Sequence, residues 1–420
     1  MYIVRSLLQK NGETVGAVLM SHDGLSQIQK AEFPDYKDKL IGVTVEPDGS
    51  LKATKGYLSV RDISGVSENE ILYKPKVSKY TIMYTDKPVL LYDSKADEVT
   101  VYNKDLLPFG LRSLEQVTSM PVYKWLSDRI SNINREYMEK VYIARMVGRD
   151  KDRVLSDSAG VSFTDKFWIK TSDVSATWDE LESQRDTNES LSPVALTGKI
   201  DADTDYLSGH TSLFTTKGYF RKAIQGGYII KMREDAELEY PASLLGRQLG
   251  ISVVECELTD ETVKIKIFTD STKSLVHAAE LKQYYGDEDE IYNHIKKINR
   301  PDLLSQLQRM YIFNYIIGNF DLHDENTGLL YDPETFEFIS VSPCYDHNVA
   351  FREGFNGVAR NTKGGTSQIE LDKLTQLFIP RHPDITERLK ELDYTEIEKY
   401  LSLRQASELK ERVQQVLSWS

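Results

Sequence analysis

Two short polar segments in the carboxyl-terminal half of the sequence carry residue types suited to phosphoryl transfer. Asp321 and Asn326 lie five residues apart, and Asp346 follows twenty residues after Asn326. Phosphoryl transfer needs little covalent help: one carboxylate orients the attacking hydroxyl and receives its proton, while an amide oxygen and another carboxylate hold magnesium. We therefore predict Asp321 as the catalytic base, and Asn326 and Asp346 as the magnesium ligands.

An ATP site also needs a positive group for the phosphates. Residues 226–231 have the composition of a β-strand that ends in Lys231, and a helix is expected over residues 240–249. Lys231 is the predicted phosphate-binding lysine. An exposed lysine at a strand end, with no role, is the competing interpretation.

A helix is predicted directly before the polar segment. Apolar residues recur at helical spacing over residues 301–317, Pro301 suits a first helical turn, and Gly318 suits the carboxyl-terminal end. The segment that holds Asp321 is therefore expected to be a loop at a helix end. An acidic, solvated turn would have the same composition.

A hairpin is predicted to return the chain to this loop. Residues 328–331 and 336–341 are strand-like, and the four residues between them are rich in turn formers. A hairpin of this length would carry Asp346 back toward Asn326.

The two polar segments together resemble the catalytic segment of HipA-like serine/threonine kinases, a prokaryotic branch of the kinase superfamily known from toxin–antitoxin pairs. The matching runs are IIGNFDLHDEN at 316–326 and PCYD at 343–346. The resemblance implies a two-lobed kinase fold, ATP and Mg²⁺ as cofactors, a protein serine or threonine as acceptor, and room for an antitoxin-like protein partner. The Tyr345-Asp346-His347 sequence departs from the Asp-Phe-Gly of eukaryotic kinases, so no activation-loop analogy is carried over.

The resemblance also places a phosphate-binding loop before Lys231. It implies nucleotide contacts from Thr216, Gly218 and Lys222, although this loop has one glycine where several are usual. Residues 251–257 and 263–268 supply two more predicted strands, with Phe268 at the hinge that would hold adenine. Three hydroxyl groups are candidate autophosphorylation sites, because an added dianion would compete with the ATP phosphates: Ser212, Thr215 and Thr216.

Composition limits the classes of function. The 420 residues include 52 Lys and Arg against 65 Asp and Glu, a net charge of −13 that argues against a general nucleic-acid-binding surface. Cys256 and Cys344 are the only cysteines, so no disulfide framework is expected. No apolar run approaches the ~20 residues needed to span a bilayer, and the amino terminus lacks a secretory signal pattern. We expect a soluble, cytoplasmic protein.

The predicted fold class is α+β: a two-lobed, protein-kinase-like fold of HipA type behind a small β-rich module. Three parts are expected: the module over residues 1–72, a lead-in and N-lobe over 73–270, and a mostly helical C-lobe over 271–420. Strand-like runs in the module are separated by turn formers, and they cover residues 2–8, 14–20, 41–45 and 51–60. Elsewhere, the pattern predicts a helix over 122–146 and a final helix that begins near Ser407.

The segment from Arg352 to Gly365 is rich in glycine and asparagine and holds three basic residues. Lids and activation segments often have this composition, so it is a candidate mobile segment near the active site. A surface loop with no role would look the same.

The predicted function is ATP- and magnesium-dependent phosphorylation of a protein hydroxyl. Three alternatives stay open: a small-molecule or lipid kinase of related fold, a catalytically silent nucleotide-binding toxin or sensor module, and a metal-dependent hydrolase. The hydrolase would use Asp321, His323, Asp324 and Asp346, but it would leave Lys231 without a purpose. In the kinase interpretation, His323 braces the loop and carries no chemistry.

Overall fold

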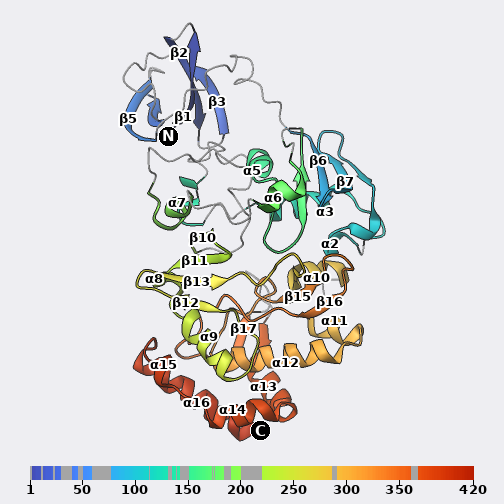
Figure 1. Cartoon of the computed structure of the whole chain (residues 1–420), viewed down its shortest axis with the longest axis vertical. Coiled ribbons are helices and arrows are strands. Elements are labelled where there is room, and N and C mark those ends of the chain that lie inside the picture. Colours follow the sequence, from blue (N-terminus) through green and yellow to red (C-terminus); the bar gives the residue numbers. More distant parts are fainter. Residues whose placement is uncertain are drawn as a thin grey trace. The chain divides into compact units, whose positions relative to one another are not determined.

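The chain folds as two units, drawn in the computed structural model of Figure 1. Unit 1 comprises residues 1–104, 117–163 and 167–226, and unit 2 comprises residues 105–116, 164–166 and 227–420. The structure describes residues 2–10, 13–21, 24–29, 40–45, 51–58, 77–112, 114–130, 135–138, 140–141, 151–172, 174, 176–183, 191–199, 220–285, 291–360 and 368–420. The predicted α+β class is confirmed, whereas the division at residues 72 and 270 stays a prediction.

Unit 1 begins with a five-stranded antiparallel sheet of order β3-β2-β1-β4-β5. The four strands predicted for the amino-terminal module are confirmed, and β3 is an additional one. Their bounds are β1 Tyr2–Lys10, β2 Glu13–Ser21, β3 Gly24–Gln29, β4 Leu40–Val45 and β5 Leu51–Leu58.

The rest of unit 1 contains a second antiparallel sheet of order β8-β7-β6-β9. Ile82, Leu90 and Trp168 are fully or almost fully buried in its core. The bounds are β6 Lys79–Tyr84, β7 Lys87–Asp93, β8 Glu98–Val101, β9 Phe167–Lys170, β10 Lys222–Gln225, α3 Ser119–Asp128, α5 Lys151–Ser158, α6 Trp178–Ser183 and α7 Ser192–Thr197.

The predicted helix over residues 122–146 is wrong as a continuous element, because α3 ends at Asp128. At the next residue the buried Arg129 side chain donates a hydrogen bond to the Gly160 carbonyl at 3.2 Å and stacks on Trp125 at 4.3 Å. These tertiary contacts outweigh the local helical pattern.

The amino-terminal part of unit 2 is a small antiparallel sheet with two helices. Strand β13 (Thr262–Lys266) lies between β11 (Tyr228–Met232) and β12 (Cys256–Leu258), and α8 (Arg233–Ala236) and α9 (Glu239–Gln248) follow β11. The strands predicted over residues 226–231 and 263–268 and the helix predicted over 240–249 are confirmed. The strand predicted over residues 251–257 is wrong for most of its length, because β12 begins only at Cys256.

The predicted helix and hairpin around the polar loop are both confirmed. Helix α12 spans Pro301–Ile316, and β15 (Gly328–Tyr331) pairs antiparallel with β16 (Phe338–Val341). Gly318 follows α12 with a φ of +61°, a backbone conformation that glycine adopts without strain. A Cβ atom at this position would also lie only 3.0 Å from the Arg412 guanidinium. The neighbouring elements are η2 Lys104–Leu106, α2 Phe109–Arg112, β14 Ser274–His277, α10 Ala278–Tyr285, α11 Ile291–Lys297, β17 Val358–Arg360 and β18 Gln368–Glu370.

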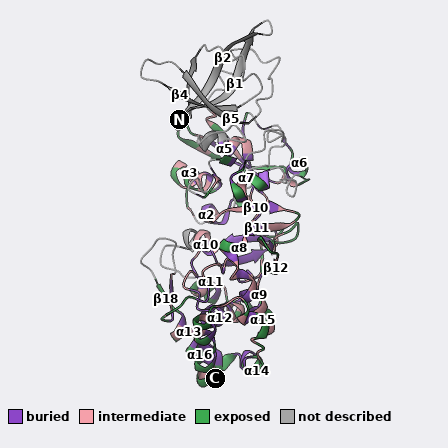
Figure 2. Ribbon diagram, turned by 90° about the vertical axis from the view of Figure 1, so that its left-hand side faces the viewer, coloured by how far each residue is buried: buried purple, intermediate pink, exposed green. Residues whose placement is uncertain are grey.

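Helices at the carboxyl end pack against α12 and close the core of unit 2. The buried residues, purple in Figure 2, include Leu307, Phe313, Phe378 and Val413. The last helix begins at Leu403, where Ser402 and Gln405 form a capping box; the predicted start near Ser407 is therefore wrong. The bounds are α13 Leu371–Phe378, η4 Ile379–Arg381, α14 Pro383–Lys390, α15 Thr395–Glu398 and α16 Leu403–Trp419.

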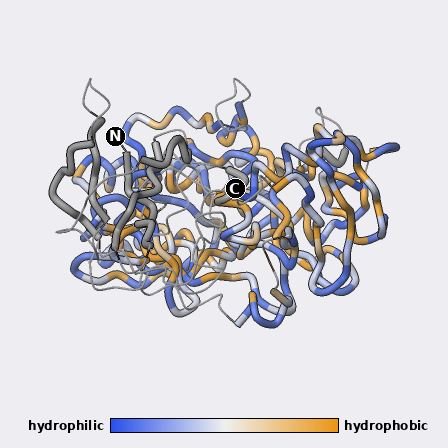
Figure 3. Tube along the Cα trace, turned by 90° about the horizontal axis from the view of Figure 1, so that it is seen from above, coloured by the Kyte–Doolittle hydropathy of each residue, from blue (hydrophilic) through white to orange (hydrophobic). Residues whose placement is uncertain are grey.

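Hydrophobic residues occur in short stretches along the trace, separated by polar ones (Figure 3). Within the part of the chain that the structure describes, no helix combines the length and the apolar character needed to cross a membrane.

Candidate active site

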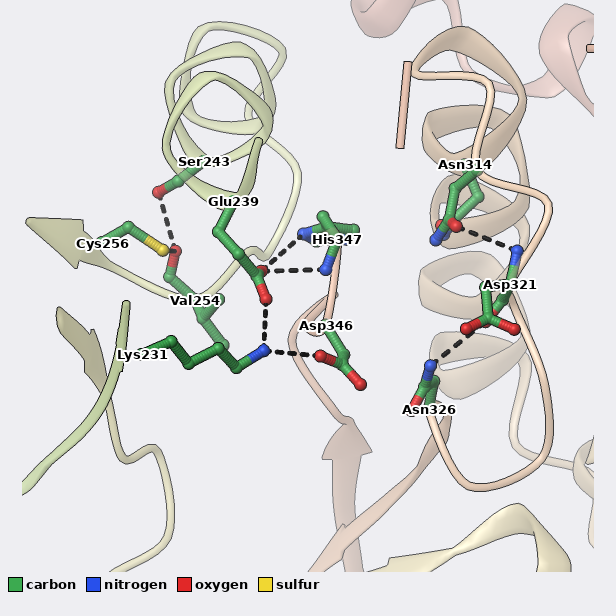
Figure 4. Close-up of polar contacts among 11 residues, drawn as sticks. Lys231, Glu239, Ser243, Val254, Cys256, Asn314, Asp321, Asn326, Asp346 and His347 are labelled. Atoms are coloured by element: carbon green, nitrogen blue, oxygen red, sulfur yellow. Dashed lines mark hydrogen bonds and ion pairs between the residues drawn. The ribbon is translucent and has the colours of Figure 1, made fainter. Parts of the chain in front are cut away.

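Lys231 lies in β11 with its side chain almost completely buried between two carboxylates (Figure 4). Its Nζ is 2.7 Å from Glu239 Oε1 and 2.6 Å from Asp346 Oδ1. Burial alone would lower the pKa of Lys231, but the two carboxylates outweigh it and raise the pKa well above its ordinary value. The structure therefore holds a permanently charged lysine at this position.

Glu239 connects three elements although its side chain is fully buried. It is the first residue of α9, where a negative charge is stabilised by the helix dipole. One carboxylate oxygen contacts Lys231 in β11, and the other accepts a hydrogen bond from the His347 N–H at 2.9 Å. From the sequence, no role is assigned to Glu239. The only feature of the sequence that could have indicated one is its position: an acidic residue at the start of a predicted helix, shortly after the lysine that ends a predicted strand.

Asp346 is positioned by its backbone as well as by Lys231. The preceding Cys344 donates to the Ser252 carbonyl at 2.8 Å and accepts from the Val254 N–H at 3.0 Å, which ties this segment to the small sheet. Asp346 itself has a φ of +62°, a left-handed conformation that Asp tolerates better than most residues. This conformation directs its carboxylate to Lys231 while the next N–H faces Glu239.

Buried amide side chains anchor the polar loop to α12. Asn314 donates to the Met310 carbonyl, and Asn319 donates to Asn314 Oδ1, both at 2.8 Å. Asn319 Oδ1 then accepts from the Asp321 N–H at 3.0 Å. Both asparagines are 1% exposed, so the predicted base sits on a rigid support rather than on a solvated turn.

Asn326 closes the same loop from its other end. Its Nδ2 donates to the Asp321 carbonyl oxygen at 3.1 Å (Figure 4), which brings the predicted base and one predicted metal ligand together. Because the amide nitrogen is used inside the loop, the side-chain oxygen is the atom left for a cation.

The carboxylate of Asp321 is partly buried and lies beside two basic side chains. Oδ1 contacts Arg360 Nη2 and lies 3.8 Å from His323 Nε2. Burial raises the pKa of Asp321, and the nearby Asp346 charge acts in the same direction, while His323 and Arg360 oppose the rise. The net direction is upward, which favours a carboxylate that can accept a proton.

His323 acts within the loop as a brace. Its Nδ1 accepts a hydrogen bond from the Glu325 N–H at 3.2 Å, so the proton of the neutral ring belongs on Nε2, facing Asp321. Burial lowers the pKa of His323, and the neighbouring carboxylates oppose this effect. This geometry agrees with the prediction that His323 holds the loop and carries no chemistry of its own.

Arg360 is the feature of this site that the sequence leaves unassigned. It ends β17, inside the glycine-rich segment singled out above, and its backbone N–H donates to the Phe320 carbonyl at 2.8 Å. The register of the β17–β18 hairpin thus sets the guanidinium against Asp321. Three basic residues in a glycine-rich loop are the only signal for it in the sequence.

The predicted nucleotide contacts are described only in part. Phe268 follows β13, and its ring lies 5.4 Å from that of Tyr345. Both rings pack on an apolar cluster that includes Val263 and Ile265, which suits a flat aromatic base. Lys222 lies in β10 of unit 1. Four further predicted residues fall outside the described residues: Ser212, Thr215, Thr216 and Gly218.

The donor set at the predicted metal site fits magnesium. Asn326 supplies an amide oxygen, and Asp346 supplies a carboxylate. Magnesium prefers hard oxygen ligands and usually takes only one or two carboxylates, completing its shell with water and substrate phosphates. Two protein ligands beside a buried lysine therefore match a cation that is held jointly with a nucleotide.

Residues 219–417 match the family model described as the HipA-like C-terminal domain. Among curated proteins no sequence matches this chain. Two solved structures are similar at low identity. The proinflammatory kinase CtkA of Helicobacter pylori is 17% identical over 46% of this chain and 86% of that chain, with a TM-score of 0.33. HipA of Shewanella oneidensis MR-1, solved with HipB and operator DNA, is 12% identical over 81% of this chain and 96% of that chain, with a TM-score of 0.47. The carboxyl-terminal part of this chain, residues 219–417, therefore matches the HipA-like C-terminal domain family over just under half of the sequence.

Proposed function

We propose that this chain is an ATP- and magnesium-dependent phosphotransferase that phosphorylates serine or threonine in a protein. The observation that carries the proposal is the buried Lys231, held between Glu239 and Asp346 at 2.7 and 2.6 Å. Kinases need such a lysine–glutamate ion pair, next to a metal-binding aspartate, to place the nucleotide phosphates. The hydrolase alternative gives this buried charge no purpose.

Each residue has one role in the proposed reaction. Lys231 neutralises the nucleotide phosphates, and Asn326 and Asp346 would hold magnesium, which supplies charge neutralisation of the β- and γ-phosphates when bound. Asp321 accepts a hydrogen bond from the acceptor hydroxyl and takes its proton as the hydroxyl oxygen bonds to the γ-phosphorus. The bond between the γ-phosphorus and the β–γ bridging oxygen breaks at the same time, and ADP leaves with that electron pair. Asn314 and Asn319 hold the backbone of Asp321 in place, and its carboxylate contacts Arg360.

The protein acceptor is supported by the HipA-like family match, whose residues 219–417 include Lys231, Asp321, Asn326 and Asp346. The antitoxin-like partner and the cytoplasmic location both stay predictions. Phosphorylation of a lipid or a small molecule would use the same Lys231, Asp321 and Asp346, so acceptor screening separates these alternatives.

A titration of ATP, with and without magnesium, tests the proposed function directly. We expect magnesium-dependent binding and transfer of label to protein. Asp346→Asn should weaken MgATP binding by at least about tenfold, because loss of even an outer-shell partner of a metal costs about 10–100-fold. Asp332→Asn, at the turn before β16, is the matched control and should bind like the unaltered protein. Unchanged MgATP affinity in Asp346→Asn would remove Asp346 from the metal site.

The pH profile of transfer should depend on Arg360. Activity requires ionised Asp321, so the rate falls as pH drops through the pKa of this carboxyl, which burial places above its ordinary value. Arg360 holds that pKa down. In Arg360→Gln the pKa should therefore rise further, and the acid limb of kcat should move to higher pH. An acid limb at the same or a lower pH would show that Arg360 does not act on Asp321, and Arg381→Gln serves as the charge-matched control.

A further inference from the structure

Two arginines lie against the aromatic ring that precedes the predicted base. The guanidinium carbon of Arg352 lies 4.0 Å from the centroid of the Phe320 ring, and that of Arg360 lies 5.2 Å from it. We call Arg352 and Arg360 the arginine pair. Stacking on an aromatic face holds a guanidinium in a defined position while leaving its N–H groups available for other partners.

The backbone fixes both members of the arginine pair to the polar loop. Arg360 donates its N–H to the Phe320 carbonyl at 2.8 Å, and Arg352 donates its N–H to the Gly318 carbonyl at 3.4 Å. The two arginines come from opposite ends of one segment, which runs from the end of the Asp346 loop to β17. Both are therefore held next to Phe320, the residue that precedes Asp321.

Of the two members of the arginine pair, Arg360 contacts a carboxylate among the described residues and Arg352 does not. Arg360 contacts Asp321 through Nη2, yet its side chain is 42% exposed and its Nε is buried without a hydrogen-bond partner in the described residues. Arg352 is exposed and has no carboxylate partner among the described residues. The adjacent acid Glu353 is engaged elsewhere, with Ser402 at 2.9 Å and Arg404 at 3.6 Å. The exposed guanidinium of Arg352 is therefore accessible to an anionic group of a ligand.

We propose that the arginine pair binds an acidic side chain of the acceptor polypeptide, close to the hydroxyl that Asp321 receives. The inference rests on the proposed function and adds a substrate class to it: serine or threonine with aspartate or glutamate nearby. Guanidinium groups match carboxylates with paired N–H donors, so two arginines beside the base would select such acceptors. If the pair only positioned Asp321, the charge of the acceptor would make no difference.

Binding of fluorescent peptides tests the inference without requiring transfer. The peptides carry alanine in place of the acceptor serine and are flanked either by glutamate or by glutamine. With MgATP present, the protein should bind the glutamate peptide at least about tenfold more tightly, as hydrogen bonds to charged groups imply. In Arg352→Ala the ratio of the two dissociation constants should fall toward one, and in Arg352→Glu it should invert. Arg381→Ala removes another arginine stacked on a phenylalanine, at 5.8 Å from Phe378, and should keep the original ratio.

Parallel transfer assays with the matching serine peptides separate the two proposals. Transfer without any preference for glutamate would overturn the inference and leave the proposed function standing. Charge-selective binding that depends on Arg352, without transfer to any acceptor, would support the inference and count against the kinase function. Equal binding of both peptides, or a preference that survives in Arg352→Glu, would overturn the inference.

Discussion

Asp321→Asn is expected to lower the rate of phosphoryl transfer by about a thousandfold, within the range that general-base catalysis contributes. The amide has the size of the carboxyl group and can still accept a hydrogen bond from Arg360, but it cannot take the proton of the acceptor. MgATP affinity should change little, because Lys231, Asn326 and Asp346 are untouched. Single-turnover transfer of labelled phosphate, measured beside the dissociation constant of ATP, checks both expectations.

Asp324→Asn is the matched control for this result. It removes the same charge from the same loop, and the Asp324 backbone carbonyl keeps its hydrogen bond from Ala279 at 3.0 Å. The control should transfer phosphate at close to the unaltered rate. If Asp321→Asn keeps more than about a tenth of the rate, its loss is below the 10²–10⁴-fold expected of a general base, and Asp321 does not take the proton.

Elements with strong local signals could be predicted closely from the sequence. The helix predicted over residues 301–317 matches α12 at Pro301–Ile316, because apolar periodicity, an amino-terminal proline and a following glycine all agree. The first strand of the hairpin matches β15. The second strand starts later than predicted, at Phe338.

The late start of β16 has a tertiary cause. Phe336 has a φ of +60°, and its ring stacks on Tyr331 at 5.5 Å and under the Arg112 guanidinium at 3.9 Å. These contacts draw Phe336 into the turn and out of the strand. Arg129 ends α3 in the same manner, through a partner 31 residues away. A local sequence pattern does not show contacts with residues that are distant in the sequence.

The same distinction between local and distant contacts applies to the candidate site. Asp321 and Asn326 could be placed together because they share one loop, which the structure closes with a hydrogen bond. The pairing of Lys231 with Asp346 spans 115 residues, and only the resemblance to a known family linked them in advance. Glu239 and Arg360 could not be assigned, since many acids begin helices and many arginines lie in loops. Their importance comes from the partners that the fold supplies.

The charge balance around Lys231 explains why this residue should dominate both activity and stability. One buried ammonium faces the fully buried Glu239 and the partly exposed Asp346. Magnesium would add positive charge on the Asp346 side, and nucleotide phosphates would add negative charge beside Lys231. Among the described residues, Lys231 is the lysine that contacts Glu239, so the site without ligands depends on it to balance that charge.

Lys231→Met is accordingly expected to lower the free energy of unfolding by about 3–5 kcal/mol, the cost of leaving a buried charge unpaired. Methionine has nearly the length of lysine, so little cavity is created. MgATP affinity and the transfer rate should both fall. Urea unfolding and ATP titration measure these effects. Lys266→Met, which breaks an exposed pair with Glu255 just before β12, should change neither quantity substantially.

The double variant Lys231→Met with Glu239→Gln separates stability from function. Replacing both partners of a buried ion pair is often close to neutral, whereas removing one is costly, and the introduced glutamine can still accept the His347 N–H with its amide oxygen. The double variant should therefore regain most of the free energy of unfolding that is lost in Lys231→Met. In a double-mutant cycle, this gain is measured as a favourable coupling energy between the two substitutions. Transfer should stay as low as in Lys231→Met, because the phosphates still lack their cation. Stability that does not return would mean that Lys231 stabilises the fold by packing, and activity that returns with it would remove Lys231 from the nucleotide site.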